Sequence, residues 1–310
     1  MASFRRTGAR LLRMTSRLLK QPAKRKKTAG ATTARAPTFS PNPGGLVMHS
    51  HVPANLRPKA PLVVLLHGCG QAPDSFAIDT GWRRLADQFG IALLMPGQVA
   101  ANNSQLCFNW FRPADTGRDL GEAASIIAMT HAMIRRHRCD PARVFITGLS
   151  AGGAMTACLL AAYPDLFAAG AVVAGLPAGS ATGVVAAMTR MAGRGKDLSA
   201  ADWLTRARSL APLAYAGPWP RLSIWHGDAD TTVAPINATQ LALQWTTLNG
   251  LDTPAVHRNV APGITCDVWG NPARPTIELW RIAGMGHVYP ADNATIAAAP
   301  SIARFWGLLA

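Results

Sequence analysis

Short apolar runs alternate with longer segments of helical periodicity along most of this chain. The run at 62–66 is apolar at every position, which predicts a strand buried on both faces. Similar runs predict further strands at 91–95, 143–147, 170–174, 221–225 and 277–282. Helices are predicted between them at 79–89, 120–138, 154–162, 235–248 and 295–309, and 181–208 is expected to be helical and irregular. This alternation predicts an α/β fold with a mostly parallel sheet covered on both faces.

A glycine-flanked serine lies between the predicted strand at 143–147 and the predicted helix at 154–162. Its sequence is Gly148-Leu149-Ser150-Ala151-Gly152, and this strand–turn–helix context is typical of a nucleophile elbow. The turn is too sharp for bulky residues at the glycine positions. It exposes the hydroxyl in front of a helix N-terminus, which favours developing negative charge. Ser150 is therefore the candidate nucleophile, and an ordinary glycine-rich turn is the alternative.

The segment after the predicted strand at 221–225 holds the candidate acid. A serine hydroxyl needs a base to accept its proton and an acid to orient that base. In the α/β-hydrolase arrangement the chain order is serine, acid, histidine, each after a strand. The segment is His226-Gly227-Asp228-Ala229-Asp230, and Asp230 lies where the loop can turn back toward the site. Asp228 is its competitor, and a local turn cap is the alternative for either aspartate.

The candidate base is His287, in the sequence Gly284-Met285-Gly286-His287 directly after the predicted strand at 277–282. The small residues of this loop allow a close approach to the serine. His67 and His226 also lie at strand ends, but each precedes a loop glycine, so we expect them to hydrogen-bond the backbone instead.

Acyl transfer also needs hydrogen-bond donors for the oxyanion. One candidate is the backbone N–H of Ala151, which follows the serine. The second is the backbone N–H of Cys69, in the loop His67-Gly68-Cys69-Gly70 after the early strand. A plain tight turn is the alternative for this loop.

Four aromatic residues are candidates for lining an acyl or aryl pocket: Trp110, Phe111, Trp225 and Trp269. Placement in the hydrophobic core is the alternative for each of them, because large apolar side chains are usually core residues.

The net charge of +15 is concentrated near the N-terminus. Residues 1–73 hold 13 Lys and Arg and no acid, which leaves 18 of the 31 basic residues against all 16 acidic ones. The overall charge is therefore no argument for nucleic-acid binding by the body of the protein. Residues 1–43 are predicted to be a basic tail, amphipathic at its start and then disordered, and 44–310 a single catalytic domain. The tail is a candidate for contact with an anionic or polymer surface, and a functionally idle tail is the alternative.

No stretch reaches the ~18 continuous apolar residues of a membrane span, and no secretory signal is evident because arginines interrupt the first apolar segment. The chain has no C-x-x-C, no H-E-x-x-H, no dinucleotide-binding glycine motif and no Walker loop. We therefore expect neither a metal nor a cofactor.

These motifs together resemble the polyhydroxybutyrate depolymerase-type esterases, a family that includes short-chain polyhydroxyalkanoate depolymerases and related feruloyl and acetyl-xylan esterases. The resemblance covers roughly residues 45–308 and rests on six segments: Leu66-His67-Gly68-Cys69-x-Gln71, Asn109-Trp110-Phe111, Gly121-Glu122-Ala123, Gly148-Leu149-Ser150-Ala151-Gly152-Gly153-Ala154-Met155, His226-Gly227-x-x-Asp230-x-x-Val233 and Gly284-Met285-Gly286-His287.

The resemblance implies an α/β-hydrolase fold with Ser150 as nucleophile, Asp230 as acid and His287 as base. It implies the amides of Cys69 and Ala151 as the oxyanion hole. It also suggests a Cys69–Cys107 disulfide, and with it an oxidising, extracellular location, whereas the missing signal segment leaves a cytoplasmic one open. The chain departs from many relatives after the histidine, where it has Val288-Tyr289-Pro290 instead of a Trp.

We therefore expect a serine carboxylester hydrolase that cleaves short-chain hydroxyalkanoate esters through an acyl-enzyme. A feruloyl or acetyl-xylan esterase is the alternative within the enzyme class. An alternative of another class is an interaction protein, anchored by its tail to a polymer granule, a membrane or nucleic acid, with a passive hydrolase body.

Overall fold

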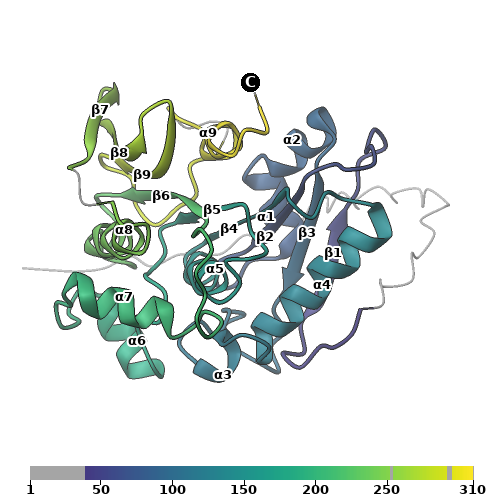
Figure 1. Ribbon diagram of the computed structural model, residues 1–310, viewed down its shortest axis with the longest axis horizontal. Coiled ribbons are helices and arrows are strands. Elements are labelled where there is room, and N and C mark those ends of the chain that lie inside the picture. The colour runs from purple at the N-terminus through teal and green to yellow at the C-terminus, as the bar shows by residue number, and fades with distance from the viewer. Residues whose placement is uncertain (1–38, 252–253, 292–294, 310) are drawn as a thin grey trace, which may run out of the picture. The chain divides into compact units, whose positions relative to one another are not determined.

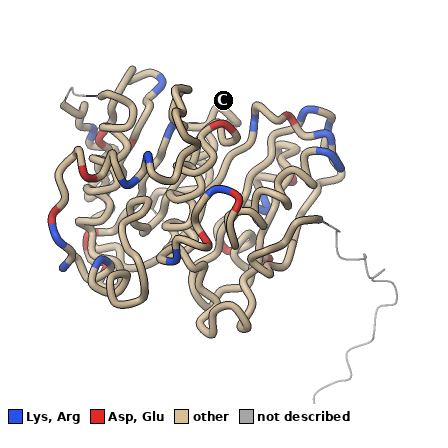
Figure 2. Tube along the Cα trace, turned by 60° about the horizontal axis from the view of Figure 1, so that its bottom comes forward, with Lys and Arg blue, Asp and Glu red and all other residues tan. Residues whose placement is uncertain are grey.

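The computed structural model describes residues 39–251, 254–291 and 295–309, which belong to a compact unit spanning Ala36–Ala310. The predicted amphipathic segment and most of the predicted tail lie outside these residues. Phe39, the first described residue, packs against the hydrophobic core, and the Gly44 amide donates to Ser125 Oγ at 2.8 Å. Basic and acidic positions are interspersed along the described chain (Figure 2). None of the helices in the described ranges has the length and apolar character needed to cross a lipid bilayer.

A nine-stranded mixed sheet forms the centre of the described unit, in the order β1-β3-β2-β4-β5-β6-β9-β8-β7 (Figure 1). Its six central strands are parallel: β3 (Ala92–Gly97), β2 (Leu62–Leu66), β4 (Val144–Leu149), β5 (Ala169–Val173), β6 (Arg221–Gly227) and β9 (Arg274–Ile282). Antiparallel strands flank them: β1 (Val47–His51) beside β3, then β8 (Ile264–Asn271) and β7 (Val256–Ala261) beyond β9.

Helices cover both faces of the sheet (Figure 1). Side chains of α4 (Gly121–His137), α5 (Ala151–Ala162) and α8 (Ile236–Leu248) form one core cluster with the first face. Side chains of α1 (Pro73–Asp79), α2 (Trp82–Phe89) and α9 (Ala298–Phe305) form the other. The remaining helices are α3 (Pro113–Thr116), α6 (Val184–Met191) and α7 (Ala200–Arg208).

This two-sided burial explains the continuous apolar run of β2. Val63 and Leu65 point into the α2 and α9 side of the core, and Leu62, Val64 and Leu66 into the other, since alternate side chains of a strand face opposite ways. Every position of the strand must therefore be apolar.

The six predicted strands and the α/β class are confirmed, whereas two parts of the prediction need correction. The helix expected at 79–89 begins only at Trp82, after Gly81 with a φ of 82° in the left-handed region, and the helix α1 before it was not predicted. The antiparallel strands β1, β7 and β8 were not predicted. In β8 only alternate residues are buried and β7 is mostly exposed, so neither has the continuous apolar run that identified the parallel strands.

The parallel strands end together at one edge of the sheet. Leu66 of β2 lies opposite Gly148 of β4, and Gly227 of β6 lies opposite Ile282 of β9. The loops that follow these strands hold all the residues predicted to be catalytic, so the fold brings them to a common edge.

Candidate active site

The backbone at Ser150 forms a sharp turn between β4 and α5. Ser150 has φ 57° and ψ −119°, a conformation that costs about 1–3 kcal/mol and is held by the surrounding structure. Its amide donates to Val173 O at 3.0 Å. A Cβ on Gly148 would lie 2.4 Å from the Gly152 carbonyl carbon, and a Cβ on Gly152 would lie 2.2 Å from Leu66 O. Both flanking positions therefore require glycine, as the elbow motif predicts.

The structure brings Asp230, and not Asp228, to His287. His287 Nδ1 lies 2.7 Å from Asp230 Oδ2. The other carboxylate oxygen, Oδ1, accepts hydrogen bonds from the Thr232 and Val233 amides, both at 2.9 Å. Asp228 Oδ1 accepts instead from the Gly284 amide at 2.7 Å, so this aspartate holds the turn that carries the histidine.

The surroundings of Asp230 keep its buried carboxyl ionised. Burial raises the pKa of Asp230, but hydrogen bonds from His226, His287 and a backbone amide outweigh it, so the pKa lies well below its usual range. The negative charge and the bond to Nδ1 fix the orientation of the His287 ring. Nε2 is then the ring nitrogen left for proton transfer.

A second histidine contacts the same carboxylate, which the sequence did not predict. His226 Nε2 lies 2.8 Å from Val233 O and 3.2 Å from Asp230 Oδ2. Both are acceptors, so Nε2 carries a proton. The predicted backbone hydrogen bond of His226 is thus confirmed, and the contact with Asp230 is additional. His67 is likewise bonded to backbone, with Nδ1 at 2.7 Å from Gly68 O, as predicted.

The loops that hold Asp230 and His287 are in direct backbone contact. The Asp228 amide donates to Ile282 O at 3.1 Å and the Ala229 amide to Met285 O at 3.2 Å. A Cβ on Gly227 would lie only 2.0 Å from Met285 O. The distance between Asp230 and His287 therefore depends on this close approach.

The loop that holds the Cys69 amide is tied down by a disulfide. Cys69 and Cys107 are bonded, which confirms the pairing suggested by the resemblance. The neighbouring amides are occupied: Gly68 N donates to Gln71 Oε1 at 2.7 Å and Gly70 N to Gln105 O at 2.9 Å. Among the described residues the Cys69 amide has no acceptor. The Ala151 amide, in the first turn of α5, has no partner within the helix either.

A buried carboxylate, Glu122, organises the far side of this loop and was not predicted to have a role. Gln98 Nε2 donates to Glu122 Oε1 at 2.6 Å, and the Asn109 amide donates to Oε2 at 2.9 Å. Gln98 in turn donates from its backbone to His67 Nε2 at 3.2 Å and from Nε2 to Cys107 O at 3.1 Å. Through Gln98, Glu122 is therefore connected to His67, at the start of the Cys69 loop, and to Cys107, the disulfide partner of Cys69. Burial raises its pKa to about 7, although these donors favour the charged form.

The aromatic residues expected in a substrate pocket have different positions. Trp225 has no exposed surface, stacks on Trp280 with 4.5 Å between ring centroids, and donates to Ser223 Oγ. Trp269 lies opposite Ile277, near the start of β9 and away from the edge that carries His287. The expectation is therefore wrong for these two, because sequence alone does not show which face or end of a strand a residue occupies. It stays a prediction for Trp110, which is buried, and Phe111, which is partly buried.

No cluster of three or more His, Cys, Asp or Glu in the described part of the chain could hold a metal ion. The free thiols of Cys139, Cys158 and Cys266 are buried, and burial raises the pKa of the first two to about 11 and that of the third as well. None of them is suited to act as a thiolate nucleophile.

We predict that Gly227→Ala destabilises the fold. The new methyl group would overlap Met285 O, and separating the two loops should cost about 2 kcal/mol or more. Gly286→Ala is the matched control, since no atom lies within 4 Å of its Cβ position and its φ is not left-handed. Thermal unfolding followed by circular dichroism checks this, and equal midpoints for the two variants would contradict it.

We also predict that Glu122 makes stability depend on pH. Because its folded pKa is about 7 and its ordinary value is 4.5, the folded state binds more protons in between. The unfolding free energy of the wild type, relative to Glu122→Gln, should be highest below pH 4.5 and fall until about pH 7, by roughly 1–3 kcal/mol. Urea unfolding of both proteins from pH 4.5 to 8 measures this difference. A difference that stays constant over this range would show that the pKa is not raised.

Comparisons with known proteins show the family of this chain. The family model described as esterase PHB depolymerase matches residues 49–263. Poly(3-hydroxyalkanoate) depolymerase C of Paucimonas lemoignei is 43% identical over 259 residues, which are 83% of this chain and 62% of that protein. Feruloyl esterase B of Talaromyces stipitatus is 31% identical over 277 residues, 86% of this chain and 75% of that protein.

Solved structures agree. The acetyl xylan esterase from Aspergillus awamori superimposes with a TM-score of 0.80 at 26% identity, covering 88% of this chain and 98% of that one. The predicted α/β-hydrolase fold and the predicted family of carboxylester hydrolases are therefore confirmed. This chain belongs to the PHB depolymerase family of esterases.

Proposed function

We propose that the protein is a serine carboxylester hydrolase in which Ser150 is the nucleophile, His287 the general base and Asp230 the acid that orients it. The observation that carries this proposal is the 2.7 Å contact between His287 Nδ1 and Asp230 Oδ2, at the same edge of the sheet as the Ser150 turn. A neutral imidazole whose Nδ1–H is held by a carboxylate has Nε2 available as a base.

In the first half of the reaction Ser150 Oγ attacks the ester carbonyl while its proton moves to His287 Nε2. The resulting imidazolium is stabilised by the ionised, buried Asp230. The negative charge that develops on the carbonyl oxygen is held by the backbone N–H groups of Cys69 and Ala151, the first fixed by the disulfide loop and the second by the start of α5. His287 then protonates the departing alcohol, which leaves an acyl group on Ser150.

In the second half water attacks the acyl-enzyme, with His287 accepting its proton. The same two amides stabilise the second oxyanion, and the proton on His287 Nε2 returns to Ser150 Oγ as the acid leaves. No cofactor is needed for either half, because each proton removed is returned by the same imidazole.

We infer that the substrates are short-chain hydroxyalkanoate esters, since the 43% identical relative bears the name of a poly(3-hydroxyalkanoate) depolymerase. Feruloyl and acetyl-xylan esters are the second candidate class, favoured by the names of the other relatives. The disulfide supports an oxidising compartment. A tail that contacts an anionic or polymer surface stays a prediction.

We predict that Ser150→Ala abolishes ester hydrolysis, lowering kcat by at least about 10³-fold on p-nitrophenyl acetate and butyrate. Ser209→Ala, which removes an exposed hydroxyl bonded to Arg206 O, is the matched control and should keep wild-type activity. Turnover by Ser150→Ala at the wild-type rate would exclude the serine mechanism.

Testing the wild type on a hydroxybutyrate oligomer and on methyl ferulate in the same series distinguishes the two substrate classes by kcat/KM. If the wild type is inert on every substrate, the passive-scaffold alternative is favoured.

We further predict that the two neighbouring aspartates differ in effect. Asp230→Asn should lower kcat on the order of 10³–10⁴-fold, because the amide no longer fixes the tautomer or stabilises the imidazolium. Asp228→Asn should change kcat far less, since its side chain still accepts the hydrogen bond from Gly284. Steady-state kinetics with folding checked by circular dichroism measure both, and the reverse order of effects would reassign the acid.

A further inference from the structure

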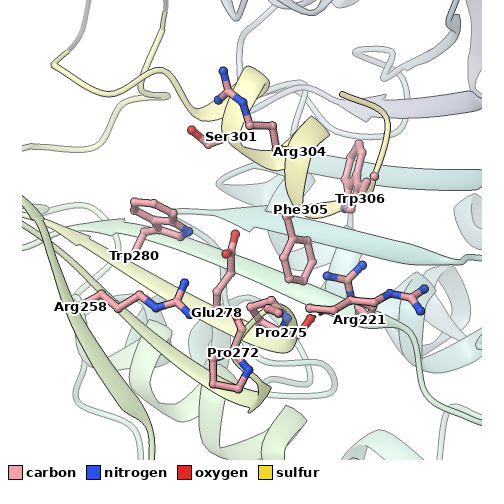
Figure 3. A pocket seen from close by; sticks show the side chains of 13 residues that line it. Arg221, Arg258, Pro272, Pro275, Glu278, Trp280, Ser301, Arg304, Phe305 and Trp306 are labelled. Carbon is pink, nitrogen blue, oxygen red and sulfur yellow. Dashed lines mark hydrogen bonds between the residues drawn. The ribbon is translucent and has the colours of Figure 1, made fainter. Parts of the chain in front are cut away.

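A cavity lies at the opposite edge of the sheet from Ser150. It has a volume of about 690 Å³ and is formed by the first residues of β6 and β9, by β7 and by the end of α9 (Figure 3). Arg221 begins β6 and Arg274 begins β9, so the cavity lies where the parallel strands start. No residue assigned above to ester hydrolysis lines it.

Positive charge is concentrated around this cavity. Arginines from four elements line it: Arg221, Arg258, Arg274 and Arg304. In the described ranges none of them has a carboxylate oxygen within 4.0 Å, whereas Arg118 and Arg281 elsewhere are paired with aspartates. The chain after residue 73 is almost neutral, so four guanidinium groups around one concavity, against the single carboxyl of Glu278, favour an anion there.

Two of the guanidinium groups are already fixed in place. Arg221 Nε donates to Pro275 O at 2.8 Å, and its Cζ lies 4.1 Å from the centre of the Phe305 ring. Arg258 Nη2 donates to Pro272 O at 2.7 Å. A guanidinium has five N–H donors, so each group keeps others for a ligand. Groups held before binding lose little conformational entropy when a ligand arrives.

The floor of the cavity contains one acid, Glu278, and apolar walls. Figure 3 shows its carboxyl directed into the space between Trp280 and Phe305. Glu278 is 7% exposed and its Oε1 accepts from Ser223 Oγ at 2.5 Å. Burial raises its pKa, whereas its hydrogen bonds and the nearby charges of Arg221 and Arg258 act in the opposite direction. The cavity therefore holds one carboxyl group against four guanidinium groups. Trp280 is fixed by stacking on Trp225 and offers a rigid apolar surface.

We propose that this cavity binds a small organic acid, with its carboxylate held by the arginines that line the cavity and its apolar body against Trp280 and Phe305. Guanidinium groups in fixed positions match the planar carboxylate. The aromatic walls distinguish an organic acid from an inorganic anion. The inference does not depend on catalysis at Ser150.

Isothermal titration calorimetry of the full chain with benzoate and butyrate tests this proposal. The same titrations are repeated with the Ser150→Ala variant, which lacks the proposed nucleophile. Binding to this variant tests the cavity alone, so a failure of the proposed hydrolase function and a failure of this site remain distinguishable. We expect both acids to bind, with an affinity that falls as salt is added, and the neutral benzamide and butyramide to bind at least ten-fold more weakly.

Arg258→Gln and Arg221→Gln should each weaken benzoate binding at least ten-fold. Arg258 lies on the exposed strand β7, so its replacement keeps the test valid even if Arg221→Gln fails to fold. Arg135→Gln, on the exposed surface of α4, is the matched control. Glu278→Gln should retain binding, because it removes the one carboxyl group among the arginines of the cavity. Amides that bind as tightly as the acids, unchanged binding in both arginine variants, or phosphate that binds as tightly as benzoate would overturn the assignment.

Discussion

The edge of the sheet that carries the proposed catalytic residues depends on one interaction, the hydrogen bonding of the buried Asp230 carboxylate. It accepts hydrogen bonds from two histidines and two backbone amides, and these donors belong to β6, to the loop after β6 and to the loop after β9. A buried charge without such partners would cost several kcal/mol, so the loops must close around it for the protein to fold. The same bonds that satisfy the charge also orient His287. The stability of these loops and the orientation proposed for catalysis therefore have one physical cause at this point.

The other side of Ser150 is organised in a similar way by a different carboxylate. Glu122 connects Gln98 and Asn109, and through Gln98 it reaches His67 and the loop closed by the disulfide. Ser150 itself is held by neither network. Its position follows from contacts between backbone atoms that only glycine at 148 and 152 permits. Three separate sets of contacts within the protein thus fix Ser150, His287 and the proposed oxyanion donors.

The parts of this arrangement that the sequence predicted are those encoded locally. The run at 62–66 identifies β2 to the residue because both faces of that strand are buried, and Ser150 is recognised from its immediate neighbours. The choice between Asp228 and Asp230 is different. Both follow the same strand, and what separates them is contact with Gly284 and His287, more than fifty residues later. The contacts of Glu122 with Gln98 and Asn109, and that of His226 with Asp230 four residues later, are hidden because they depend on how the intervening loops fold. Trp225 and Trp269 were predicted to line a pocket, but the sequence shows neither how deeply an aromatic residue is buried nor where along a strand it lies.

The two edges of the sheet differ in how their charges are used. At the edge that carries Ser150 the charged groups are satisfied by hydrogen bonds within the protein. Asp230 is bonded to His287, and Glu122 accepts from the Asn109 amide. That suits a neutral ester, which needs aligned dipoles and a base rather than a net charge. At the opposite edge the guanidinium groups of Arg221 and Arg258 donate to backbone carbonyls, which carry no net charge, and among the residues that line the cavity Glu278 is the one acid beside four arginines. The negative charge of an organic acid is attracted by these guanidinium groups, whereas an ester carries no such charge. The sheet therefore separates a surface suited to neutral carbonyl chemistry from one suited to anions, and the separation follows from where each carboxylate is buried.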